Sequence, residues 1–328
     1  MKSVYKIPQK IKCLTDERKR KSIPLFNIVM PVLLFLMLQY ESFHTIFSAP
    51  ESMSKRLKNC LSRKKHTGET EYFYRSVVCM IIGKSPHVIL GQEMLKPRDG
   101  AEKDEGELTG GKRLIKRLRQ RHVHFADVIV ADALYLNAPF INTVKENGLD
   151  AVIRLKDEKR LIFQDAEGLF NQGKGKKKSF QHGKKTIEVW DLSKFEMENC
   201  PYRLRVVRYH ESWQENGKEA ERWIWLVTTL EETAPPVLWE MMNCRWDIEE
   251  NGFHQLKTYY HAKHCYCHAA VETIFNLMII GFNMRELYLY RRIQRFERSG
   301  ITRKSVSRIF RDDLLTEKVK QILYQKGG

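Results

Sequence analysis

The chain has 328 residues, 42% of them hydrophobic, which is enough for a real core in one large domain or about two or three smaller ones. Lysine and arginine total 57 against 40 acidic residues, and the formal charge of +17 favours a polyanion such as nucleic acid as partner. Seven scattered cysteines with no CxxC pair argue against a disulfide framework and indicate a reducing, cytoplasmic compartment.

The first apolar segment, Ile23 to Tyr40, imitates a signal sequence or a membrane anchor. Pro24, Asn27 and Pro31 interrupt it. The longest unbroken apolar stretch is therefore far shorter than the ~20 residues that a bilayer span requires. The segment predicts a buried helix and no membrane association.

The next part of the chain alternates between basic and apolar segments. Ser54 to His66 carries six basic residues and no acid, so we expect it to be solvated and irregular. Tyr72 to Ile82 and His87 to Leu90 are rich in β-branched, aromatic and apolar residues and flank a turn, which predicts a β-hairpin. Leu108 to Gln120 repeats apolar residues at helical spacing.

A strand, a helix and a second strand are predicted around Asp132. Asp127 to Ala131 is a strand candidate that ends at this aspartate, Ala138 to Asn147 fits a helix ended by glycine, and Ala151 to Leu155 is again strand-like. This alternation predicts a parallel pair in an α/β sheet. Asp132 alone could simply cap the turn that follows its strand.

The pattern changes between Lys156 and Thr229, where short strand candidates are separated by polar turns and predict an antiparallel β insertion. The candidates are Leu161 to Phe163, Thr186 to Trp190, Tyr202 to Tyr209 and Arg222 to Thr229. Gly173 to Lys185 is rich in lysine and is predicted to be a loop, either merely solvated or in contact with phosphate.

Helical character returns after the insertion. Val237 to Lys257 is predicted to be helical, with a break near Cys244 or Gly252, and Val271 to Tyr290 is a long apolar helix. Arg291 to Arg311 is a basic tail.

The cluster from Arg245 to Lys257 is the second place where carboxylates could carry chemistry. On an ideal helix Arg245 and Glu249 lie about 40° apart, Glu250 and Lys257 about 20°, and Glu249 and Lys257 about 80°. Helix geometry alone therefore slightly prefers Glu250 as the partner of Lys257. One alternative is an ordinary amphipathic helix with solvent-facing ion pairs. The other is that this helix and Asp132 hold carboxylates of a divalent-metal centre.

Two segments, Phe125 to Tyr135 and Arg245 to Lys257, resemble the DDE transposases of bacterial insertion sequences. The resemblance implies an α/β fold with an RNase H-like mixed sheet, interrupted by an antiparallel β insertion, between a helical N-terminal segment and a basic helical tail. The implied domains are an N-terminal helical and basic segment, the first part of the core, the β insertion, the second part of the core and the basic tail, at residues 1–66, 67–157, 158–235, 236–292 and 293–328.

The resemblance also assigns roles to residues of this chain. It implies that Asp132 and Glu249 are catalytic and bind metal, and that Arg245 and Lys257 contact DNA phosphates. Seven residues separate Glu249 from Lys257 where the family has six, so Glu250 remains an alternative.

In intact members of the family the resemblance implies two Mg²⁺ or Mn²⁺ ions, cleavage and joining of DNA ends, and a homodimer on DNA. The first catalytic aspartate is missing here, because the basic segment Ser54 to Thr70 takes its place. No credible replacement is found among Glu41, Glu51, Glu69 and Glu71. An internal deletion between Cys60 and Leu61 explains this best. The prediction is a transposase or its inactive remnant, with a non-catalytic DNA-binding protein as the alternative.

A group of histidines and cysteines near the C-terminal end of the core is a competing metal site, made of His261, His264, Cys265, Cys267 and His268. Imidazole and thiolate are the usual zinc ligands, but the spacing matches no common zinc finger. Exposed or DNA-facing histidines are the other interpretation.

Overall fold

The computed structural model of the chain describes residues 7–15, 24–38, 60–64, 66–68, 70–97, 104–264, 270–292, 300–302, 305–306 and 308. The chain divides into two compact units. One comprises residues 59–83 and 90–249, and the other comprises 1–58, 84–89 and 250–328. The described residues form helices and a mixed sheet, which confirms the predicted α/β class.

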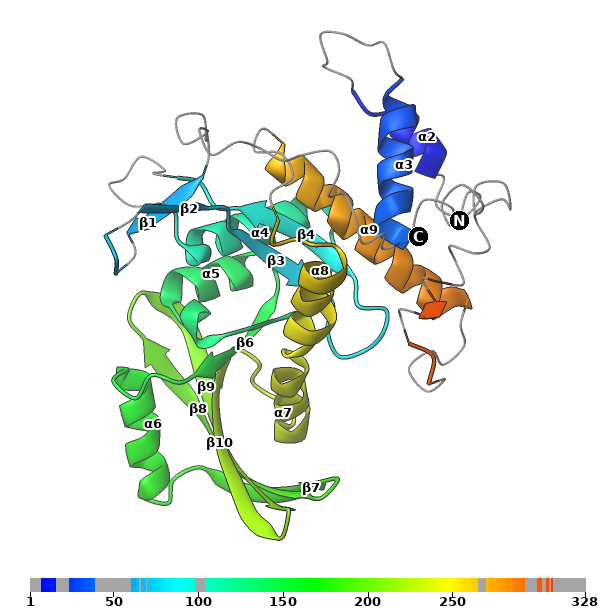
Figure 1. The fold of residues 1–328 in the computed structure, drawn as a ribbon. Helices are drawn as coiled ribbons and strands as arrows, with labels where there is room; N and C mark the ends of the chain where they lie inside the picture. The colour runs from blue at the N-terminus through cyan, green and yellow to red at the C-terminus, as the bar shows by residue number, and fades with distance from the viewer. Residues whose placement is uncertain are drawn as a thin grey trace. The chain divides into compact units, whose positions relative to one another are not determined.

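A six-stranded sheet dominates the first unit, and most of its strands are labelled in Figure 1. The strand order is β5-β6-β10-β9-β8-β7. Its strands are β5 (Val128–Ala131), β6 (Asp150–Leu155), β7 (Lys176–His182), β8 (Lys185–Met197), β9 (Cys200–Glu215) and β10 (Lys218–Thr228). β5 and β6 are parallel, as predicted, and every other pairing is antiparallel. The strands of the predicted insertion therefore continue the sheet that begins at the strand before Asp132.

Helices cover both faces of this sheet. α5 (Ala138–Glu146) and α6 (Leu161–Asn171) pack on one face, and α7 (Pro235–Cys244) packs on the other (Figure 1). Because side chains alternate along a strand, Val206 of β9 joins the core under α5 and α6 while Val207 joins the core under α7.

Two small sheets precede the large one in the chain. β1 (Leu61–Lys64) and β2 (Thr70–Phe73) pair antiparallel, and β3 (Ser76–Met80) pairs with β4 (Ile89–Met94). α4 (Glu107–Arg121) packs on β3 and on α5. Among the described residues the β3–β4 pair is not hydrogen-bonded to the six-stranded sheet, so β5 is an edge strand.

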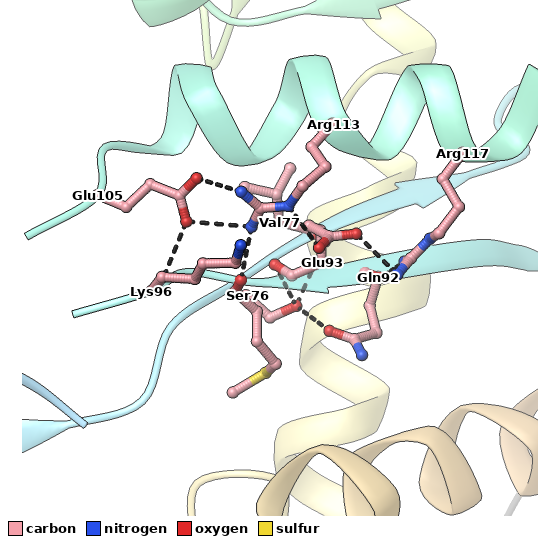
Figure 2. A network of polar contacts seen from close by, with 9 residues as sticks. Ser76, Val77, Gln92, Glu93, Lys96, Glu105, Arg113 and Arg117 are labelled. Atoms are coloured by element: carbon pink, nitrogen blue, oxygen red, sulfur yellow. Dashed lines mark hydrogen bonds and ion pairs between the residues drawn. The ribbon is translucent and has the colours of Figure 1, made fainter. Parts of the chain in front are cut away.

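Charged side chains join α4 to β4 (Figure 2). The Arg113 guanidinium binds Glu93, with Nε 2.6 Å from Oε1, and also binds both carboxylate oxygens of Glu105. Arg117 lies 2.7 Å from the other oxygen of Glu93. Glu105 also accepts the backbone N–H of Lys96 at 2.8 Å. Two largely buried carboxylates are thus neutralised from one helix.

The second unit contains the helices α2 (Ile7–Lys12), α3 (Leu25–Leu38), α8 (His254–Tyr259) and α9 (Val271–Arg292). α3 packs against α9, and the predicted N-terminal helix buries Leu33 and Leu36 but continues through Pro31. Asn283 of α9 binds the backbone N–H and carbonyl of Ile89, each at 2.8 Å. Among the described residues no helix is both long and apolar enough to cross a bilayer.

Some sequence predictions of local structure were wrong. Leu161 to Phe163 begins the helix α6, because Ile162, Phe163, Ala166 and Phe170 bury one helical face. Gly173 to Lys185 contains β7, which pairs along its whole length with β8. Ser54 to His66, expected to be irregular, includes β1, and Tyr72 to Ile82 is split between β2 and β3. The tail from Arg291 to Arg311 lies mostly outside the described residues.

Candidate functional site

Asp132 lies where β5 ends, at the start of a 3-10 turn, η2 (Ala133–Tyr135). Its Oδ1 accepts the backbone N–H of Ala133 at 2.6 Å and lies 3.5 Å from Nζ of Lys156. The aspartate therefore caps the turn, as the simpler interpretation of its position predicted. It also keeps 44% of its side chain exposed, which leaves the carboxylate open to a ligand.

Nearby positive charge keeps Asp132 ionised. Burial raises the pKa of this carboxyl, but the hydrogen bond from Ala133 and the charges of Lys156 and Arg245 outweigh burial and hold the pKa below its usual value. The same carboxylate and Glu107 add to the effect of burial on Tyr135, whose pKa rises to about 12. The Asp132 side chain is thus ionised and lies near the positively charged side chains of Lys156 and Arg245.

Arg245 links the two predicted carboxylates. It follows the last residue of α7, and its Nη1 donates to Oε1 of Glu249 at 2.9 Å. Its side chain is only 10% exposed, and its guanidinium lies 4.9 Å from the ring centroid of Trp246. Since the charge of Arg245 also acts on Asp132, the structure brings three of the predicted site residues into one neighbourhood.

The predicted break in the long helix is confirmed, and it has an unusual form. After α7 the chain forms a π-helix, η3 (Ile248–Phe253), before α8 begins at His254. The angles of an ideal α-helix therefore do not apply between Glu249 and Lys257. Lys257 belongs to α8 in the second unit, where its Nζ lies 5.7 Å from the ring centroid of Phe253.

Another carboxylate of this segment has a structural partner. Oδ2 of Asp247 accepts the backbone N–H of Gly83 at 2.7 Å. Gly83 has a φ of +90°, a conformation that side chains other than glycine rarely adopt. Asp247 therefore holds the turn after β3.

Sequence reasoning missed a group of cations beside Asp132. Arg154 is the penultimate residue of β6 and Lys156 directly follows this strand, which pairs in parallel with β5. Arg222 of β10 donates to the fully buried carboxylate of Glu211 at 2.7 Å. The carboxyl ends of adjacent parallel strands lie together, and this rule could have identified Arg154 and Lys156 from the sequence.

Glu211 is the best-satisfied carboxylate of this neighbourhood. It accepts from Arg222, from Nζ of Lys185 at 2.9 Å and from the indole N–H of Trp239 at 2.8 Å. Burial raises the pKa of Glu211, but these three hydrogen bonds outweigh burial and lower it. Because both of its oxygens accept hydrogen bonds from buried or partly buried donors, Glu211 is a structural anion and not a free metal ligand.

No group of three or more histidine, cysteine, aspartate or glutamate side chains able to hold a metal ion is found in the described residues. Two buried acids, Glu93 of β4 and Glu105 just before α4, are bound by arginine. Glu41, Glu51, Glu69 and Asp99 lie outside the described part, as do Cys265, Cys267 and His268 of the proposed zinc cluster.

Comparisons with known proteins identify a family. The model of the transposase DDE domain matches residues 54–284. A solved structure of the piggyBac transposase synaptic complex with hairpin DNA is similar at 12% identity and a TM-score of 0.37, covering 77% of this chain and 55% of that one. This chain thus spans about half of that transposase. No curated protein matches. The family match covers most of the chain, including Asp132, Arg245, Glu249 and Lys257, and the chain therefore belongs to the DDE transposase domain family.

Proposed function

We propose that this transposase-family chain binds DNA across the end of its sheet at Asp132, and that in its present form it does not cleave DNA at a normal rate. The observation that carries the proposal is the concentration of cations around the two predicted carboxylates, together with the position of β5 at the edge of the sheet.

Positive charge near Asp132 and over the whole chain supports the proposal that the protein binds DNA. Lys156, with a 52% exposed side chain, and Arg245 both act on Asp132, and the chain carries an excess of 17 positive charges. The phosphate backbone supplies the anions that such a surface attracts. DNA ends of a mobile element are the partner that the family suggests, with two copies of the chain on DNA as a further expectation.

The proposal that the chain does not cleave DNA at a normal rate rests on the number of carboxylates at the site. In the family, carboxylates hold Mg²⁺ or Mn²⁺, and Asp132 and Glu249 have the right oxygen donors for one such ion. Two-metal phosphoryl transfer also needs a carboxylate that bridges the ions. Because the described residues place no third carboxylate with these two, they do not fit a complete two-metal centre. A deletion that removed the first aspartate accounts for this.

The π-helix favours Glu249 over Glu250 as the residue in the catalytic position. A π-helix closes i→i+5 hydrogen bonds and takes more residues per turn than an α-helix. Such a wide turn accommodates one additional residue between the glutamate and the lysine. The seven-residue gap from Glu249 to Lys257 is therefore compatible with the six-residue spacing of the family.

Filter binding of a labelled DNA duplex over a range of salt tests the proposal. If about six phosphates are neutralised, the plot of log affinity against log salt should have a slope of about −5 through counterion release. Binding should tolerate changes of sequence. Absence of binding at low salt, or binding that does not depend on salt, would contradict the proposed function.

A further inference from the structure

Arg154 of β6 occupies the position opposite Asp132 in the parallel strand pair. β5 and β6 pair in register up to Ala131 and Ile153, so the following position of each strand holds Asp132 and Arg154. Side chains two residues apart on a strand share a face, and Val152 faces the core under α7. Arg154 therefore lies on the α7 face, at the end of the sheet where Asp132 ends β5.

Arg154 has both cations and anions as neighbours, and the effect of the cations is the larger. Its Nε is buried and has no hydrogen-bond partner among the described residues. Burial lowers the pKa of Arg154, and the neighbouring charges of Arg222 and Arg245 lower it further, against opposite effects from Asp132 and Glu211. A guanidinium in this position is poorly compensated by the protein alone.

The two neighbouring arginines share this property. The Nε atoms of Arg222 and Arg245 are also buried without a hydrogen-bond partner in the described chain, and the Arg245 side chain is nine-tenths buried. Their Nη atoms bind Glu211, Asn243 and Glu249. Buried donors in folded proteins nearly always have acceptors, so these three guanidinium groups carry donors and positive charge that the described protein groups around them do not fully satisfy.

We propose that Arg154, together with Arg245, binds a DNA phosphate beside Asp132. The inference rests on the proposed function, because it takes DNA as the ligand. Guanidinium groups match phosphate oxygens with paired N–H donors, and a phosphate at the partly exposed Arg154 would bring negative charge to this cluster of arginines. Arg154 thus joins Arg245 and Lys257 as an expected DNA contact.

The test replaces Arg154 with Gln, which keeps much of its length and removes its charge. In fluorescence anisotropy with a labelled duplex, Arg154→Gln should bind about tenfold more weakly and reduce the magnitude of the salt slope by about one. Its melting temperature should not fall, because the substitution removes repulsion from two arginines. Arg203→Gln, an exposed arginine of β9, is the matched control and should leave affinity and slope nearly unchanged.

Arg154→Lys keeps the positive charge and should recover most of the lost salt slope. Unchanged affinity and slope in Arg154→Gln, with steep salt dependence in the unmodified protein, would overturn this inference and leave the proposed function standing. A lower melting temperature with unchanged affinity would assign Arg154 to structure instead. Failure of the unmodified protein to bind DNA at low salt would contradict the proposed function and, with it, this inference.

Discussion

Glu211 is the residue at which burial and charge can be tested most cleanly. Its side chain is fully buried, and Arg222, Lys185 and Trp239 all donate to it. Its pKa is lower in the folded chain than the ordinary value of 4.5. The stability that comes from its ionised form is therefore present above that value and is lost as the pH falls through the folded pKa.

Replacing Glu211 with Gln should therefore destabilise the fold at neutral pH by about 3 kcal/mol, because two cations would lose their buried partner. Urea unfolding at about pH 7 and about pH 4 should show a smaller difference between variant and unmodified protein at the lower pH. Glu219→Gln, an exposed residue of β10, is the control and should change little at either pH. An equal loss at both pH values would contradict the role given to ionised Glu211.

Arg245 is a predicted DNA contact that donates a hydrogen bond to Glu249 and whose charge also acts on Asp132. Arg245→Ala should weaken DNA binding about tenfold or more, since it removes a charge-assisted contact to phosphate. It should also destabilise the fold, because the side chain is 90% buried and packs on Trp246. Anisotropy and thermal melting measured on the same sample separate the two effects. Unchanged DNA affinity would restore the interpretation of an ordinary ion-paired helix.

At the scale of elements, periodicity predicted most of the sheet and its helices. The strands around Asp132, α4, α5 and α9 follow clear apolar patterns, and the structure confirms them. The run Leu161 to Phe163 fits either a strand or a helix, and only Ala166 and Phe170 reveal the helical face. β7 is rich in exposed lysine, so its strand comes from pairing with β8 rather than from its own composition. The π-helix has no apolar pattern of its own, so only its place, not its form, was predicted.

Arg113 connects α4 to β4 through ion pairs. Glu93 and Glu105 both bind it (Figure 2), and their side chains are only 12% and 2% exposed. Arg113→Met should cost about 3 kcal/mol, because both carboxylates would be left buried with less compensation. Chemical denaturation measures the loss, and Arg121→Met at the exposed end of α4 is the matched control. A loss no larger than that of the control would show that the network contributes little to the fold.

At the scale of the whole molecule, the candidate site could be predicted only in part. Asp132, Glu249 and Arg245 were identified by resemblance, and the structure groups them. Arg154 was missed because a single arginine within a strand has no local signal. Only the predicted parallel pairing of its strand with the strand before Asp132 marks its position, and its neighbours Arg222 and Arg245 come from distant parts of the chain. In the part of the chain that the structure describes, the sheet also ends at β5, where a deletion before β1 would remove an adjoining strand.

Restoring the expected strand should repair both fold and site. Inserting a strand followed by aspartate between Cys60 and Leu61 should cover the edge of β5 and supply a third carboxylate. The expected result is a sharper, more cooperative melt together with Mg²⁺-dependent nicking, and Asp132→Asn in the same background should abolish the nicking. An insert of equal length with Asn in place of the aspartate is the control, which should regain only the melt.

Nicking of end-labelled duplex DNA by the unmodified chain in Mg²⁺ or Mn²⁺, with DNA binding measured in parallel, tests most directly whether the chain binds DNA without cutting it. We expect DNA binding without nicking at a normal rate. Robust nicking that disappears in Asp132→Asn would contradict it, and would show that a third carboxylate outside the described residues, with Glu41 and Asp99 as the first to test, completes the metal centre.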